Sequence, residues 1–209
     1  MESEKFDIAK IYPKLYVASK EKPTIVEVPL MRILAINGEG DQKGPRFKDS
    51  IDALYAVAYA IRSLPRKNII LDGFVDFNTA PLEAMWSMKN GSIFDASQKN
   101  NLLWEVFIVV PGFVTQKVVD MAITQASLLQ PNERYHDLHI SSLQEKTSIQ
   151  ILHTGSLKGL RKATTLLGTH LLKKGYKPAL RHHEIYLSNP TRIKTGRLRV
   201  IVRQPVTKV

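Results

Sequence analysis

The order of apolar patterns along the chain predicts an α+β fold made of two similar modules. Each module reads as a strand, an amphipathic helix and two further strands. The segments of the first module are 31–38, 46–64, 81–88 and 104–111, and those of the second are 147–154, 157–174, 182–188 and 198–205. Because one helix covers only one face of a small antiparallel sheet, we expect helices on the outer faces and a ligand groove between the modules.

Short matching segments support the duplication. Residues 81–87 align with 182–188, with the correspondences Glu83–Glu184 and Met85–Tyr186. The strand that follows ends at a proline in both modules, at Pro111 and at Pro205. The identity between the modules is low, so the repeat is inferred from the pattern of elements.

Each of the two main helices carries one apolar stripe. The stripe residues recur every three or four positions, which is typical of a helix packed on a sheet. They are Phe47, Ile51, Leu54, Ala58 and Ile61 in the first helix, and Leu160, Ala163, Leu167 and Leu171 in the second. Pro65 is expected to end the first helix, and Gly175 to cap the second.

These segments predict a single domain over residues 1–209. It consists of two pseudo-repeats, at about 23–130 and 131–209, with 1–22 as an N-terminal arm. Additional strands are expected at 24–28 and 138–143, and an additional helix at 115–129.

The composition is that of an ordinary globular protein, with 209 residues, 44% hydrophobic and 23% charged. No cysteine is present, which excludes disulfides, thiol nucleophiles and thiolate metal sites. No apolar run approaches the ~20 residues of a membrane span, and the N-terminus lacks the pattern of a signal peptide. We therefore expect a cytoplasmic protein that does not interact with membranes.

A formal net charge of +11 raises the question of a nucleic-acid partner. The basic residues are scattered, and no helix-turn-helix, zinc-finger spacing or aromatic-basic RNA motif accompanies them. A solvated basic surface explains the charge better, so no specific nucleic-acid partner is expected.

The strand over 182–188 places three chemically active side chains on one face. Successive residues of a strand point to opposite faces, so His182, Glu184 and Tyr186 lie together. Glu184 and Tyr186 are about 7 Å apart along the strand. This arrangement is either a ligand site or a solvated outer face with one acid.

If Glu83 and Glu184 both face the groove, the groove holds two related carboxylates among aromatic side chains. Such a cleft suits planar aromatic or cationic small molecules. The candidate ligand-binding residues are Glu83, Met85, Trp86, Trp104, Phe107, His182 and Tyr186.

Neither a metal nor another cofactor is expected. The histidines have no metal-ligand spacing, and the adjacent His182 and His183 face opposite ways on a strand. Tyr55 and Tyr59 lie beside the apolar stripe of the first helix. They are either boundary residues with wet hydroxyls, or one hydroxyl reaches a pocket.

The sequence resembles the GyrI-like small-molecule-binding domain family over nearly all of its length. The segments that carry the resemblance are KPTIVEVP (22–29), NGEGD (37–41), IDALY (51–55), APLEAMW (80–86), HHEIYLSNP (182–190) and RQPV (203–206). Ser87 departs from the second tryptophan that many members have, and Asn189 from the common aspartate.

The resemblance implies a duplicated fold with a ligand groove between its halves. Some members bind structurally diverse toxic compounds, while others resemble hydrolases that open the cyclopropane ring of genotoxins. In the hydrolytic kind, Glu184 and Tyr55 match the catalytic positions. A third kind of relative inhibits a topoisomerase, so the alternative is a protein-interaction or sequestering module with another protein as its partner.

The chemistry of ring opening agrees with that pair of residues. Opening an activated cyclopropane requires water at carbon and a donor to the conjugated oxygen. Glu184 suits the role of general base, and the Tyr55 hydroxyl that of donor.

Overall fold

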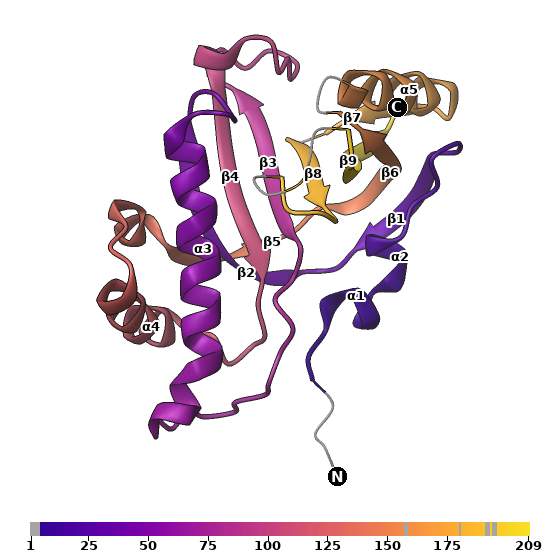
Figure 1. Cartoon of the computed structure of the whole chain (residues 1–209). Coiled ribbons are helices and arrows are strands. Elements are labelled where there is room, and N and C mark those ends of the chain that lie inside the picture. The colour runs from indigo at the N-terminus through magenta and orange to yellow at the C-terminus, as the bar shows by residue number, and fades with distance from the viewer. Residues whose placement is uncertain (1–4, 157–158, 180, 191–192, 194–195) are drawn as a thin grey trace.

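The computed structural model describes residues 5–156, 159–179, 181–190, 193 and 196–209 (Figure 1). The helices are α1 (Ile8–Ile11), α2 (Pro13–Tyr16), α3 (Pro45–Ser63), α4 (Gln116–Leu129) and α5 (Leu160–Lys173), with 3₁₀ turns η1 (Leu64–Lys67), η2 (Lys99–Asn101) and η3 (Glu133–Asp137). The strands are β1 (Thr24–Val28), β2 (Met31–Glu39), β3 (Leu82–Met88), β4 (Leu102–Val109), β5 (His139–Leu143), β6 (Lys146–Gly155), β7 (Tyr176–Pro178), β8 (His182–Tyr186) and β9 (Leu198–Lys208).

The predicted α+β fold class is confirmed. The strands form one curled antiparallel sheet in the order β1-β6-β9-β8-β3-β4-β2-β5, and β7 pairs with the end of β9. The element that the sequence predicts over 157–174 is α5, and residues 157 and 158 lie outside the described residues. Gly175 follows α5 with φ +71°, as expected of a helix-capping glycine.

The two modules meet edge to edge. In the first, the strand order is β3-β4-β2, and in the second it is β8-β9-β6, with β3 and β8 paired at the centre. The leading strand of each module crosses to the other one, so that β1 pairs with β6 and β5 with β2.

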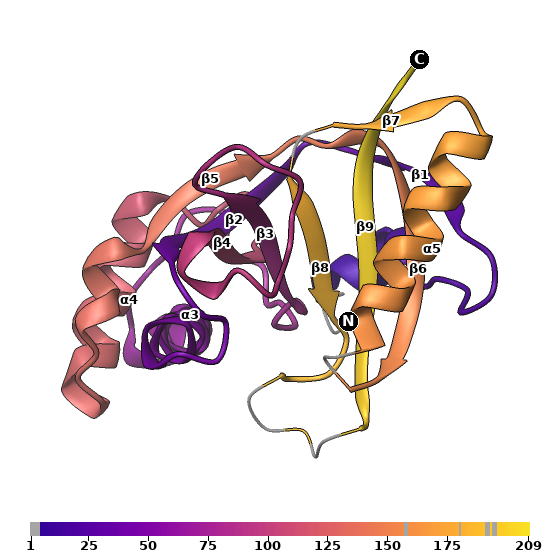
Figure 2. The ribbon, with the colours of Figure 1, turned by 90° about the horizontal axis from the view of Figure 1, so that it is seen from above.

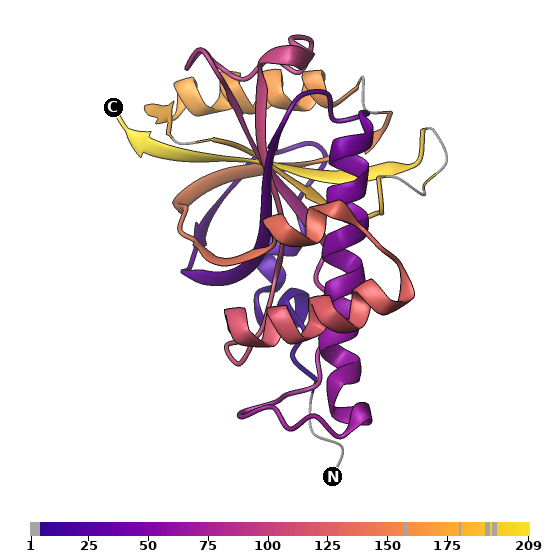
Figure 3. The same cartoon turned by 90° about the vertical axis from the view of Figure 1, so that its left-hand side faces the viewer.

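Helices α3 and α5 flank the central strands on one face of the sheet. Helix α3 packs on β2 and β4, and α5 packs on β6 and β9. Figure 2 shows the two helices on either side of β3 and β8. The modules therefore join by strand pairing, with one helix on either side of the joint, and do not turn uncovered sheet faces towards one another. Helix α4 crosses the outer side of α3 (Figure 3).

The prediction that the last strand of the second module ends at Pro205 was wrong. Proline removes one N–H donor from a strand, but its carbonyl still accepts. Pro205 pairs with Ser148 at the end of the β6 ladder, and its carbonyl accepts from the Ala179 N–H. Strand β7 then pairs with the remainder of β9, which continues to Lys208.

A close contact between β2 and β4 explains one glycine. Gly38 pairs with Trp104, and a Cβ atom built on Gly38 would lie 2.1 Å from the indole ring. The tryptophan is buried and therefore occupies the space that a side chain at residue 38 would need.

We predict that Gly38→Ala lowers the free energy of unfolding by about 1 to 3 kcal/mol, because the methyl group overpacks the core. Urea denaturation measures the effect. The matched control is Gly168→Ala in α5, where an added Cβ meets no atom within 4 Å. Replacing a helix glycine there is expected to be neutral or stabilising by up to about 1 kcal/mol. Equal losses in the two variants would contradict the packing argument.

Candidate functional site

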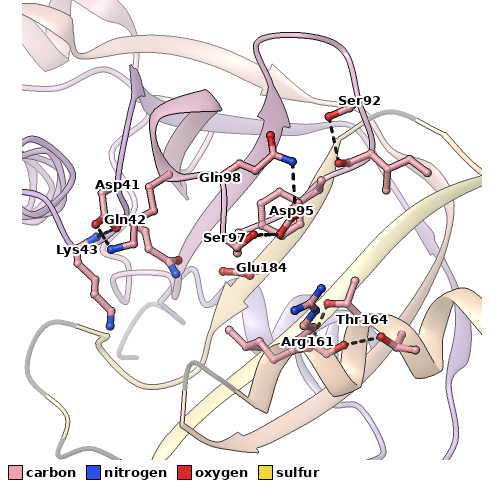
Figure 4. A pocket seen from close by; sticks show the side chains of 16 residues that line it. Asp41, Gln42, Lys43, Ser92, Asp95, Ser97, Gln98, Arg161, Thr164 and Glu184 are labelled. Carbon is pink, nitrogen blue, oxygen red and sulfur yellow. Dashed lines mark hydrogen bonds and ion pairs between the residues drawn. The ribbon is translucent and has the colours of Figure 1, made fainter.

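A cavity of about 1010 Å³ lies between the two modules (Figure 4). Its walls are the loop after β2 (41–43), the loop between β3 and β4 (92–99), and the first turns of α5 (160–165). Glu184 of β8 lies at its floor. The volume is sufficient for a drug-sized organic molecule.

Both carboxylate oxygens of Glu184 have a partner on the same strand. The Tyr186 hydroxyl donates to Oε2 at 2.5 Å, and His182 Nε2 lies 3.3 Å from Oε1. The three residues are almost completely buried, but only Glu184 is among the residues that line the cavity. Burial, reinforced by the neighbouring carboxylate, raises the pKa of Tyr186 well above its ordinary value, so the phenol remains a donor.

Aromatic rings support the histidine. The Phe94 ring stacks on the His182 imidazole, with the centroids 4.4 Å apart and the planes 8° apart. Trp86 lies beside Phe94 at 6.0 Å, and Phe47 of α3 stacks on Trp86 at 5.3 Å. This layer connects α3, β3 and the 92–99 loop to the floor of the cavity.

The strand register separates the predicted ligand-binding residues into two groups. Directly paired residues share a face, and the pairs Trp86–His182, Ala84–Glu184 and Leu82–Tyr186 define the cavity face. Trp104 pairs with Trp86 and lies on this face too. Three of the predicted ligand-binding residues, Glu83, Met85 and Phe107, lie on the opposite face.

The expectation that Glu83 and Glu184 face the groove together was therefore wrong. Glu83 pairs with Ile185 and Glu184 pairs with Ala84, so the two acids stand in neighbouring rows, and neighbouring rows of a sheet point to opposite faces. One row of paired residues crosses the sheet, and it consists of Ile36, Val106, Ala84, Glu184, Val202 and Ile151. Ala84, and not Glu83, is thus the residue of β3 that shares the cavity face directly beside Glu184.

Glu83 belongs instead to a buried network on the opposite face. It accepts a hydrogen bond from the Tyr16 hydroxyl at 2.8 Å, and its Oε2 lies 2.9 Å from His183 Nε2, an ion-pair contact without hydrogen-bond geometry. His183 Nδ1 is 3.0 Å from Glu145, which also accepts from Arg203 at 3.4 Å. The network thus contains two acids, an arginine and a histidine.

The same network holds the N-terminal arm. Arg203 donates to the Leu15 carbonyl at 2.6 Å, and Gln150 donates to the Lys14 carbonyl at 2.8 Å. Together with Tyr16, these contacts fix α2 on the sheet face away from the cavity. Met85 and Phe107 pack on this side, and the Phe107 ring lies 5.6 Å from that of His183.

The charges of the network shift two pKa values. For Glu145, burial is the largest effect and disfavours the charge, but His183 and then Arg203 outweigh it and lower the pKa. For His183, burial also disfavours the charge, but Glu145 and then Glu83 outweigh it and raise the pKa. The contact between Glu145 and His183 therefore favours the charged form of each of them.

Tyr55 lies on α3 and is half-buried. Its ring stacks with that of Tyr59, with the centroids 6.4 Å apart. Within the described part of the chain, Tyr55 is not one of the residues that line the cavity. The structure therefore brings Glu184, His182 and Tyr186 together, but leaves the donor role of Tyr55 as a prediction.

Several lining residues were not predicted from the sequence. They include Phe94, Leu160, Arg161 and Thr164. Phe94 is the one aromatic residue in the polar segment 89–101, which was the available signal for it. Leu160 belongs to the apolar stripe of its helix and gave no such signal.

The described residues contain no group of three or more histidine and acidic side chains that could hold a metal ion. In the same part of the chain, no helix combines the length and the apolar character that a membrane crossing requires.

A curled antiparallel sheet with a large cavity walled by two loops and the first turns of α5, and with an acid on the cavity floor, defines a small-molecule-binding α+β domain. The model of the GyrI-like small molecule binding domain family matches residues 21–205, and the chain belongs to this family. No curated protein sequence gives a significant match.

Solved structures agree with this assignment. Two crystal structures described as hydrolases from Listeria innocua are each 28% identical to the chain, with TM-scores of 0.88 and 0.85. The alignments cover 98% and 97% of this chain, and 100% of each of those chains. The C-terminal domain of EcmrR is 14% identical with a TM-score of 0.59, over 90% of this chain and 98% of that one, and shares the fold.

We predict that the free energy of unfolding falls as the pH rises above about 6.5. The pKa of His183 is raised in the folded state, so its contribution is complete below its ordinary value of 6.5 and is lost as the pH rises through the folded value. The pKa of Glu145 is lowered, so its contribution is present above 4.5 and is lost as the pH falls through the folded value.

Urea denaturation at a series of pH values measures this profile. His183→Asn is expected to flatten the alkaline side of the curve, whereas the exposed His136 supplies a control variant, His136→Asn, that leaves it unchanged. A wild-type curve that rises between pH 6.5 and pH 8 would contradict the paired-charge interpretation.

Proposed function

We propose that the protein binds hydrophobic or aromatic small molecules in the cavity between the modules. The observation that carries this proposal is the position of Glu184, a carboxylate at the floor of a large cavity with both oxygens supported from β8. Membership in a small-molecule-binding family supports the same function.

The chemistry of the floor defines which part of a ligand it accepts. An ionised carboxylate only accepts hydrogen bonds, so the ligand places a donor, a cationic group or a water molecule against Glu184. The Tyr186 hydrogen bond fixes the orientation of the carboxylate. Planar aromatic or cationic compounds meet these requirements.

We further propose that the protein hydrolyses activated cyclopropane rings. Glu184 takes a proton from water while the water oxygen forms a bond to a ring carbon. The strained carbon–carbon bond breaks, and its electron pair moves through the conjugated system to a carbonyl oxygen, which takes up a proton. The net reaction adds H and OH across the broken bond. The structural similarity to the two Listeria innocua hydrolases supports this extension.

Tyr55 is the proposed donor of the proton to the carbonyl oxygen. The basis for this role is the match to the family's catalytic tyrosine on the first helix, and α3, which carries Tyr55, flanks the central strands.

Glu184→Gln is predicted to retain affinity for neutral planar compounds and to lose any hydrolysis by about 10²- to 10⁴-fold, because the amide cannot take the proton from water. Calorimetric titration measures binding, and loss of the cyclopropane chromophore measures turnover. The control is Glu27→Gln on the exposed side of β1, which should change neither. Full turnover in Glu184→Gln would refute the general-base assignment. If the wild-type protein binds no planar compound at micromolar concentration, the binding proposal fails.

Tyr55→Phe tests the donor separately. Removal of a hydroxyl that stabilises developing negative charge is expected to lower kcat by about 10²- to 10³-fold with little change in affinity. The neighbouring exposed Tyr59 provides the control variant Tyr59→Phe. If Tyr55→Phe and Tyr59→Phe both turn over at the wild-type rate, another group donates the proton.

A further inference from the structure

Phe94 is the only aromatic side chain among the described residues that line the cavity. The aromatic residues that the sequence predicts as its wall, Trp86, Trp104 and Tyr186, are at most 3% exposed and do not line it. Any π surface that a ligand reaches in this part of the structure is therefore that of Phe94.

The ring of Phe94 is held from behind. Its inner face lies on the His182 imidazole at 4.4 Å and 8°, and Trp86 lies beside it. His182 in turn is in contact with Glu184 at 3.3 Å. A flat ring in a fixed orientation and the floor carboxylate thus share one supporting residue.

The loop that carries Phe94 is linked at both ends to the end of β2 and to the loop that follows β2. Lys89 forms an ion pair with Glu39 at 2.9 Å, and Lys99 forms one with Asp41 at 2.6 Å. Within the loop, the Asp95 carboxylate accepts hydrogen bonds from the Ser97 N–H and hydroxyl. These contacts hold the loop, and with it the Phe94 ring, against the cavity.

We infer that Phe94 is the residue that selects planar ligands, by offering the outer face of its ring for stacking beside Glu184. This inference rests on the proposed binding function and assigns its specificity to one side chain. The ligand class is a planar conjugated ring system with a hydrogen-bond donor at the edge that faces the carboxylate. A saturated ring of the same size fills the volume but cannot stack.

The alternative is that Phe94 blocks the binding of planar ligands, and this alternative predicts the opposite effect of removing its ring. If the Phe94 ring occupies the place of the ligand on His182, the ring must leave before a planar compound binds. Removing the ring would then strengthen binding of planar compounds.

Naphthalene-2-carboxamide and decahydronaphthalene-2-carboxamide form a suitable probe pair, because they are neutral, similar in size and differ in planarity. Isothermal titration calorimetry measures the affinity of each for wild-type protein and for Phe94→Leu and Phe94→Tyr. The control is Phe74→Leu, since Phe74 is also half-buried and pairs with an aromatic ring, Phe113, but does not line the cavity.

The wild-type protein and Phe74→Leu are expected to prefer the planar probe by about 3- to 10-fold, as one aromatic stack contributes. Phe94→Leu is expected to lose this preference and Phe94→Tyr to keep it. Equal binding of the two probes by the wild type, or tighter binding of the planar probe by Phe94→Leu, would overturn the assignment but leave the binding function intact. If the wild-type protein binds neither probe and no other planar compound, both the Phe94 assignment and the proposed binding function are overturned.

Discussion

The pairing of β3 with β8 is the interaction on which the rest of the structure depends. It joins the two modules into one sheet, and it sets Glu184 directly opposite Ala84 at the centre of the repeat. The surrounding row is nearly symmetric, with valine and then isoleucine on either side. The duplicated fold therefore supplies a cavity at its junction, and the acid is supplied by one module only.

The two faces of strand β8 lie in very different environments. On one face Glu184 opens to the cavity, and on the other the side chain of His183 is closed off among Glu83, Glu145 and the arm. Buried charges are tolerated only when each has a partner, and removing one partner is costly. The network satisfies this condition, and it fixes β8 from behind while the cavity face stays open. Support of a site by buried contacts behind it is a common requirement for exact placement of its functional groups.

Much of the fold could be predicted from the sequence, because the element order, the helix stripes and the alternation in 182–188 are local patterns. Local alternation correctly grouped His182, Glu184 and Tyr186. The position of Glu83 could not be obtained in the same way, since it depends on which residues pair across strands, and an alignment with few identities left that register open. Phe94 was missed for a related reason. It lies in a polar loop, and only the folded chain shows that the loop covers the central strands.

The exchange of leading strands between the modules has a consequence for how the chain acquires its structure. Strand β2 has its outer neighbour in β5, more than one hundred positions later in the chain, and β6 has its outer neighbour in β1. Because each half takes its outer strand from the other half, the first half cannot complete its part of the sheet before the second half has been synthesised. Sequence-distant pairing of this kind slows folding. The two halves resemble each other as repeats, but they mature as one interlocked body.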